Sequence, residues 1–199
     1  MKNVLNCQTT NYDCGPTCVT NAIRFLFERE EIPPVILKEI WTMGIDTYAE
    51  GGEPGKAGTS KAAMRYMAAW FDCYAEKCGF PLRATFLDSD FAAIRPGSLI
   101  WRGLEKGGCA VVRVSHYGSG HYVLLTELLS ENAVGLFDPY DGDPDERRPG
   151  IRFVEGDPKR KNREVSVDVI NGTDDSHYAM GPLEKREVLL FLRRDKQRA

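Results

Sequence analysis

The order of the hydrophobic patterns along the chain is the feature that most restricts its fold. Apolar residues recur with a helical period in the first 80 residues or so, whereas most later apolar runs are typical of strands. Predicted helices follow Cys14, cover 35–43, and run from Thr59 or Ser60 to Gly79. Predicted strands, separated by turns, cover 82–87, 98–101, 109–115, 122–129, 133–137, 150–154, 165–170 and 188–192. Helices followed by consecutive strands predict an α+β fold with helices packed on an antiparallel sheet.

Length and composition predict one domain over residues 1–199. The chain is 42% hydrophobic and 28% charged, which is ordinary for a globular protein, and it is long enough to bury a sizeable core. The segment at about 141–186 is unusually charged, and we interpret it as an insertion in this domain. Its acidic start at 141–146 resembles a calcium loop, but glutamate replaces the glycine expected at the sixth position. We therefore predict no metal and no cofactor.

Charge and hydropathy exclude two classes of partner. The 26 basic and 29 acidic residues give a net charge of −3, so no overall basic field would attract nucleic acid. No apolar run approaches the 20 or so residues of a membrane span, and the N-terminus lacks a signal-peptide pattern. Six cysteines in a sequence without a leader favour reduced thiols, and hence a cytoplasmic protein without a membrane anchor. No oligomeric state is assigned.

A cysteine at the predicted start of the first helix has the context of a nucleophile. Asp13 is the expected N-cap of this helix, so Cys14 falls in the first turn, where Pro16 is tolerated. The helix dipole and a nearby imidazolium would both stabilise a thiolate there. Gln8 lies six residues upstream, on the approach loop. Its amide, together with the Cys14 backbone N–H, could donate to an oxyanion.

A predicted β-hairpin and the strand after it supply a base and a group that orients it. His121 opens the strand that follows the glycine-containing turn at 117–120, and Asp138 ends the returning strand. A strand out and a strand back place the two side chains near the same end of the sheet. Asp138 can then fix the tautomer and orientation of the imidazole. His116 is the weaker candidate for the base, and we expect it and His177 at the surface.

Each of these residues also has a purely structural interpretation. A cysteine in a helix is most often a small buried hydrophobic residue, a histidine before a strand is often a surface group, and Asp-Pro often marks a turn. We keep the structural interpretation for the other cysteines, Cys7, Cys18, Cys73, Cys78 and Cys109. For the four candidates, the combination of residue types in this order favours a thiol hydrolase.

The segment from Gln8 to Cys18 resembles the N-terminal signature of the bacteriocin-processing, double-glycine-type cysteine peptidases of the papain-like superfamily. The sequences around 57–60, 120–124 and 137–139 resemble further elements of that family, and the resemblance extends over roughly residues 1–140. It implies a papain-like fold, with Cys14 as nucleophile, His121 as base, Asp138 as orienting residue and Gln8 as oxyanion donor. Known members are joined to a membrane transporter, which this chain lacks.

Three functions are compatible with these residues. A cysteine peptidase would cleave a bond in a peptide or protein substrate, at small residues if it follows the family. A thiol acyltransferase would form the same acyl-enzyme but pass the acyl group to an amine or thiol. A non-catalytic module would use the groove to hold a peptide. Because the four residues occur together, the sequence favours an enzyme, and we expect a cysteine peptidase.

Overall fold

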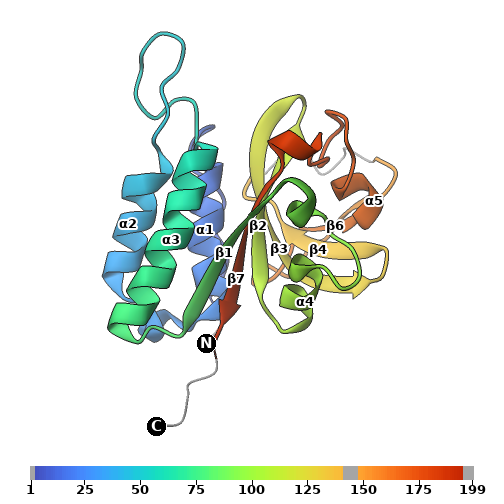
Figure 1. Ribbon diagram of the computed structural model, residues 1–199. Coiled ribbons are helices and arrows are strands. Elements are labelled where there is room, and N and C mark those ends of the chain that lie inside the picture. The colour runs from blue at the N-terminus through green and yellow to red at the C-terminus, as the bar shows by residue number, and fades with distance from the viewer. Residues whose placement is uncertain (1–2, 141–147, 195–199) are drawn as a thin grey trace.

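The computed structural model describes residues 3–140 and 148–194 as helices packed on one large sheet (Figure 1). The α-helices are α1 (Cys14–Leu26), α2 (Pro34–Gly44), α3 (Lys61–Cys78), α4 (Leu99–Glu105) and α5 (Val167–Ile170). The strands are β1 (Leu82–Asp88), β2 (Cys109–His116), β3 (Ser119–Ser130), β4 (Ala133–Phe137), β5 (Ile151–Phe153), β6 (Arg163–Ser166) and β7 (Glu187–Arg193). Short 3-10 helices are η1 (Arg29–Glu31), η2 (Ser89–Ala92) and η3 (Leu183–Lys185).

The described strands form one seven-stranded antiparallel sheet in the order β1-β7-β2-β3-β4-β6-β5. The predicted α+β class is therefore confirmed. The C-terminal strand β7 lies inside the sheet between β1 and β2. The first and the last strand of the chain are therefore paired with each other. The charged segment predicted as an insertion contributes β5 and β6, and β6 pairs directly with β4.

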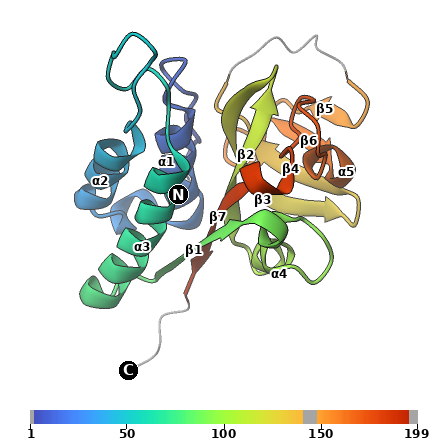
Figure 2. The same ribbon diagram turned by 45° about the horizontal axis from the view of Figure 1, so that its top comes forward.

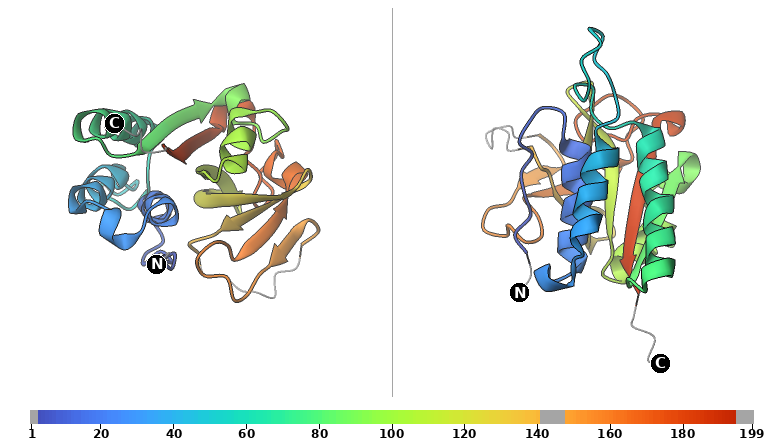
Figure 3. Two further views of the ribbon diagram at one scale, coloured as in Figure 1. Left: turned by 90° about the horizontal axis from the view of Figure 1, so that it is seen from below. Right: turned by 90° about the vertical axis from the view of Figure 1, so that its left-hand side faces the viewer.

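Two apolar cores lie on opposite faces of the sheet. The helices α1, α2 and α3 cover one face, where Phe71 and Ile23 are buried, while α4 and α5 lie on the other side (Figures 1 and 3). Successive residues of β2 alternate between the cores, with Val111 in the first and Val112 in the second. This alternation follows from the two-residue period of a strand. It explains why the central strands read as nearly continuous apolar runs.

The predicted strand at 98–101 is wrong and the one at 165–170 is confirmed only at 165–166, because a serine begins a short helix in each. At 98–101 the chain forms the start of α4, and the Ser98 hydroxyl accepts a hydrogen bond from the backbone N–H of Trp101. At 165–170 the strand β6 ends at Ser166, whose hydroxyl accepts from the N–H of Asp168 and opens α5. A short apolar run has no period long enough to distinguish helix from strand, so the cap decides the outcome.

The two predicted N-cap residues occupy their positions, but only the one that precedes α3 makes a side-chain capping bond. Ser60 caps α3 through the N–H of Ala63, and Gly79 ends that helix in the left-handed conformation, with φ of 65°. Asp13 occupies the N-cap position of α1 but makes no side-chain capping bond. Its carboxylate instead binds the loop that precedes the helix, which leaves the N-terminal turn of α1 without a side-chain cap.

Three segments meet at one end of the molecule. The loop between α2 and α3 projects beyond these helices, and the hairpin between β2 and β3 extends toward the same end (Figures 1 and 2). The hairpin turns through Tyr117 and Gly118, with φ of 52° and 83°, as a tight two-residue connection requires. The same end holds the start of α1.

Among the described residues, none of the helices has the length and apolar character needed to cross a membrane.

Candidate active site

Cys14 is the first residue of α1, as the sequence predicts. The first backbone hydrogen bond of this turn runs from the N–H of Thr17 to the carbonyl of Asp13 at 3.0 Å, so the N–H of Cys14 precedes the helical ladder. The neighbouring Gly15 packs so closely on Thr59 that a Cβ atom there would collide with its side chain. Cys14 is 7% exposed and lines a cavity of about 350 Å³.

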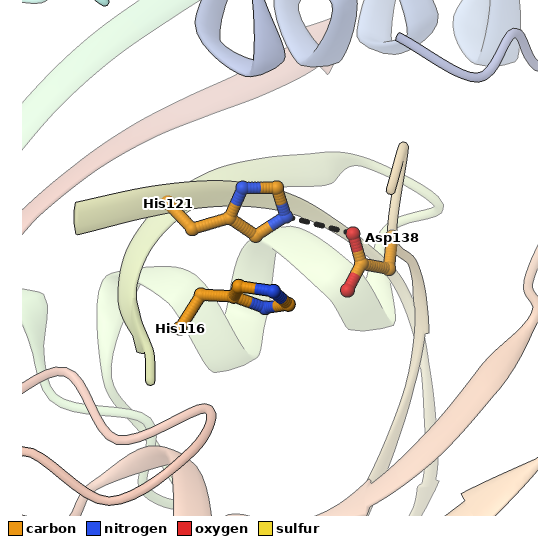
Figure 4. A group of neighbouring side chains, drawn as sticks. All are labelled: His116, His121 and Asp138. Carbon is orange, nitrogen blue, oxygen red and sulfur yellow. Dashed lines mark hydrogen bonds and ion pairs between the residues drawn. The ribbon is translucent and has the colours of Figure 1, made fainter. Parts of the chain in front are cut away.

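His121 and Asp138 form a buried pair. The Nε2 atom of His121 lies 2.7 Å from Oδ1 of Asp138, and the two residues are 6% and 1% exposed. Figure 4 shows that the other ring nitrogen, Nδ1, points away from Asp138. A carboxylate can only accept, so Nε2 carries the proton in this bond. Nδ1 is then the nitrogen that exchanges a proton with another group.

The contacts of His121 favour its charged form. Burial lowers the pKa of His121, but hydrogen bonds with Asp138 and with Cys14 outweigh burial and raise it from 6.5 to about 10. The histidine is therefore coupled to both neighbours at once. An imidazolium between a carboxylate and a thiolate is the electrostatic arrangement that activates a cysteine nucleophile.

Asp138 is held by groups distant from it in the sequence. Its Oδ2 accepts a hydrogen bond from the Tyr178 hydroxyl at 2.6 Å, and its Oδ1 accepts one from the backbone N–H of Tyr140 at 2.8 Å. Burial raises the pKa of this carboxyl, but the bonds from His121, Tyr178 and Tyr140 outweigh it and hold the pKa below its ordinary value. Asn162 fixes the backbone by two bonds of 2.8 Å with the N–H and carbonyl of Asp138.

Tyr178 and Asn162 are site residues that the sequence reasoning missed. Tyr178 is 1% exposed and has a φ of 67°, which is rare for an aromatic residue. Two backbone bonds near this position, between Tyr178 and Ser115 and between Ser115 and Ala179, hold the segment against the end of β2. Both residues lie in the charged segment, about 25 and 40 residues after Asp138, and no local motif marks them.

The loop that carries Gln8 is organised by Asp13. The Asp13 carboxylate accepts four hydrogen bonds, from the backbone N–H and the hydroxyl of both Thr9 and Thr10, at 2.7–3.1 Å. Burial raises the pKa of Asp13, but these four bonds outweigh it and lower the pKa. The backbone N–H of Gln8 donates to the Pro139 carbonyl at 2.9 Å. This bond places the loop beside the residue that follows Asp138.

The structure brings together three of the four predicted site residues. Cys14, His121 and Asp138 form a connected chain, whereas the side chain of Gln8 donates to the Thr10 carbonyl at 2.7 Å. Within the described part of the chain, Oε1 of Gln8 is buried and has no hydrogen-bond partner. The oxyanion role of Gln8 stays a prediction, because its amide is used here by the loop backbone.

The remaining histidines surround the pair, which differs from the surface position predicted for them. The rings of His116 and His121 face each other (Figure 4), with their centroids 5.0 Å apart, and the buried His177 lies 4.9 Å from His116. The ligand atoms of His116, His121 and Asp138 lie within 4.8 Å of one another, so this group has the composition of a metal site. However, two members of this group, His121 and Asp138, are joined to each other by a hydrogen bond. The acidic segment 141–146, whose sequence resembles the start of a calcium loop, lies outside the described residues.

The other cysteines lack this environment. Cys18 and Cys109 are fully buried, and burial raises the pKa of both thiols. The Cys18 thiol donates to the Tyr122 carbonyl at 3.1 Å. Cys7, Cys73 and Cys78 are exposed, and all six cysteines are free of disulfides. Cys14 is thus distinguished by its position at a helix start and by its contact with His121.

Comparison with known proteins assigns no family. No protein-family model matches the chain, and no curated protein matches its sequence. Cys14, His121 and Asp138 place a thiol at a helix start, an imidazole in contact with it, and a carboxylate bonded to the imidazole, which is the arrangement expected for a nucleophile, a base and an orienting acid.

Proposed function

We propose that the protein is a papain-like cysteine peptidase, of the type that resembles the bacteriocin-processing enzymes. One observation carries this proposal: His121 interacts with Cys14 on one side and lies 2.7 Å from Asp138 on the other. The helices packed on an antiparallel sheet are compatible with such a fold. The substrate would be a peptide or protein that enters the cavity beside Cys14.

The proposed reaction uses the two ring nitrogens of His121 differently. Nε2–H stays bonded to Asp138, while Nδ1 takes the proton of the Cys14 thiol. The thiolate attacks the carbonyl carbon, and the resulting oxyanion is stabilised by backbone N–H groups at the start of α1. His121 then gives its proton to the leaving amine, and a thioester forms. Water, deprotonated by His121, hydrolyses the thioester and regenerates the thiol.

The cysteines of the chain suit this chemistry. None of the six cysteines is in a disulfide, which suits a reducing, cytoplasmic setting. A nucleophilic Cys14 would lose activity if it were held in a disulfide. We therefore propose that the enzyme works in that compartment.

Selective alkylation tests the proposal without a known substrate. At pH 5.5–6, iodoacetamide should modify Cys14 before the exposed Cys7, Cys73 and Cys78, because ordinary thiols are protonated there. The modified residue is identified by mass spectrometry of peptides after partial labelling. His121→Ala should remove the preference while the exposed cysteines react as before. Equal reaction of Cys14 and Cys73 in the native chain would refute an activated thiol.

Gln8→Ala tests the predicted oxyanion donor. Alkylation of Cys14 by iodoacetamide forms no oxyanion, so its rate should be unchanged in this variant. Acyl transfer from a small ester should fall by about a hundredfold, the usual cost of losing one oxyanion donor. The measurement compares the two rates per folded molecule. If the variant instead lowers only the melting temperature, the Gln8 side chain serves the Thr10 carbonyl and not the reaction.

A further inference from the structure

Two adjacent cavities form a groove that passes from Cys14 across Arg113. The first, of about 350 Å³, contains Cys14, and the second has a volume of about 410 Å³. Both are lined by Thr59, Arg113, Ser119 and Gly120. A bound peptide that reaches Cys14 would therefore pass beside the guanidinium of Arg113.

The cavity that contains Cys14 is cationic, although the chain as a whole is acidic. Lys56 and Arg113 line the first cavity, and among the described residues that line it none carries a carboxylate. Lys56 is paired with Glu53 at 2.6 Å, but both side chains are about half exposed, so solvent screens this pair. The net charge of the chain is −3, so the local positive charge is not a property of the whole surface.

A buried carboxylate, that of Glu187, forms an ion pair with Arg113. Glu187 Oε1 lies 3.4 Å from Nε of Arg113 and accepts a 2.7 Å hydrogen bond from the Tyr122 hydroxyl. The Glu187 side chain is 4% exposed, whereas that of Arg113 is 34% exposed. The carboxylate is thus enclosed, and the guanidinium is the charged group of this pair that a ligand can reach.

Gly120 gives the guanidinium its position. A Cβ atom at Gly120 would collide with the guanidinium of Arg113, so the charged group lies directly over this glycine. Gly120 immediately precedes His121 on β3. The guanidinium is therefore fixed over the residue that precedes the predicted base in the chain.

We propose that Arg113 is a specificity residue that binds a carboxylate of the substrate in the groove beside Cys14. A guanidinium presents paired N–H donors that match a carboxylate, and a fixed position lowers the entropic cost of the contact. The carboxylate belongs either to an acidic side chain or to the C-terminus of a peptide. This inference rests on the proposed peptidase function and names the chemistry of its substrate.

Charged and neutral alkylators test the inference at Cys14. Iodoacetate is an anion and iodoacetamide is its neutral analogue, so the ratio of their rates reports the charge at the thiol. In Arg113→Gln the ratio of the iodoacetate rate to the iodoacetamide rate should fall about fivefold or more at low salt, and because both reagents react with the same thiolate, any change in the thiolate fraction cancels in this ratio. Arg83→Gln is the matched control, because Arg83 is exposed on β1 and does not line the groove. An unchanged ratio in Arg113→Gln would overturn the inference.

Peptides that protect Cys14 from iodoacetamide identify the source of the carboxylate. Three N-acetylated peptides of one length are compared: one with glutamate and an amidated C-terminus, one neutral with a free C-terminus, and one neutral and amidated. Protection by the first alone indicates an acidic side chain, and protection by the second alone indicates the terminal carboxylate. Either effect should be lost in Arg113→Gln. If all three peptides protect equally, Arg113 does not select a carboxylate.

The two proposals fail in different ways. A Cys14 that does not react preferentially with iodoacetamide overturns the peptidase function, whatever the ratio shows. A reactive Cys14 without an Arg113-dependent anion preference overturns only the specificity. Because Arg113→Gln leaves Glu187 buried without its counter-ion, it can fail to fold. The double variant Arg113→Gln/Glu187→Gln removes both charges, and the ratio should still fall in it, though less than in Arg113→Gln, because the guanidinium donors that bind the anion are lost.

Discussion

Cys14→Ala should reduce acyl transfer to the uncatalysed background, a loss of about 10⁶-fold. In the proposed reaction the Cys14 sulfur attacks the carbonyl, and the neighbouring Cys18 thiol cannot replace it because it is fully buried. The substitution removes one atom at the start of α1, beside a cavity, so folding should be almost unaffected. Ester hydrolysis and urea unfolding, measured on the same preparation, separate these two effects.

Cys18→Ala is the matched control for this variant. Cys18 lies one turn further along α1, is fully buried and donates a hydrogen bond to the Tyr122 carbonyl. Its loss should lower the free energy of unfolding by about 1–2 kcal/mol and leave turnover per folded molecule intact. The two cysteines should therefore show opposite patterns. Loss of turnover in Cys18→Ala, with Cys14→Ala active, would mean that Cys18 and not Cys14 is the nucleophile.

His121→Ala should reduce turnover more than Asp138→Asn does. His121→Ala removes the imidazole that contacts Cys14, and turnover should fall about as far as in Cys14→Ala. Asp138→Asn keeps the shape of the side chain but replaces one accepting oxygen with a donor. It should cost about 10²–10⁴-fold, because the imidazole loses the acceptor that orients it.

The pH dependence of Asp138→Asn should also change. In the native chain the pKa of His121 is raised to about 10, so the imidazolium persists until the pH approaches 10, and the stability that it contributes is fully present below about 6.5 and is lost between 6.5 and 10. Without the carboxylate the pKa falls. The alkaline limb of the pH–rate profile should therefore move to lower pH in the variant. An unmoved limb would mean that another group titrates there.

His116→Ala is the control for both histidine effects. Its ring lies 5.0 Å from that of His121, yet the short hydrogen bond to Asp138 comes from His121. The substitution should change turnover by less than about tenfold. If His116→Ala were inactive and His121→Ala active, His116 would be the base.

The sequence by itself determined the elements whose signals are local. The 3.6-residue period predicts the helix that begins at Cys14, and alternating or continuous apolar runs predict β2, β3 and β4. The glycine-containing turn before His121 and the return to Asp138 predict a hairpin and a third strand that bring these two side chains together. Such features depend on neighbours within a few residues, so a single sequence carries enough information to predict them.

Only the tertiary structure decided what surrounds these side chains. The Tyr178 hydroxyl reaches Asp138 across 40 residues, and the Glu187 carboxylate reaches Arg113 across most of the second half of the chain. Contacts of this kind depend on which strands pair and where loops cross. They leave no periodicity or spacing in the sequence, because burial and long-range geometry choose the partners only after the sheet has formed.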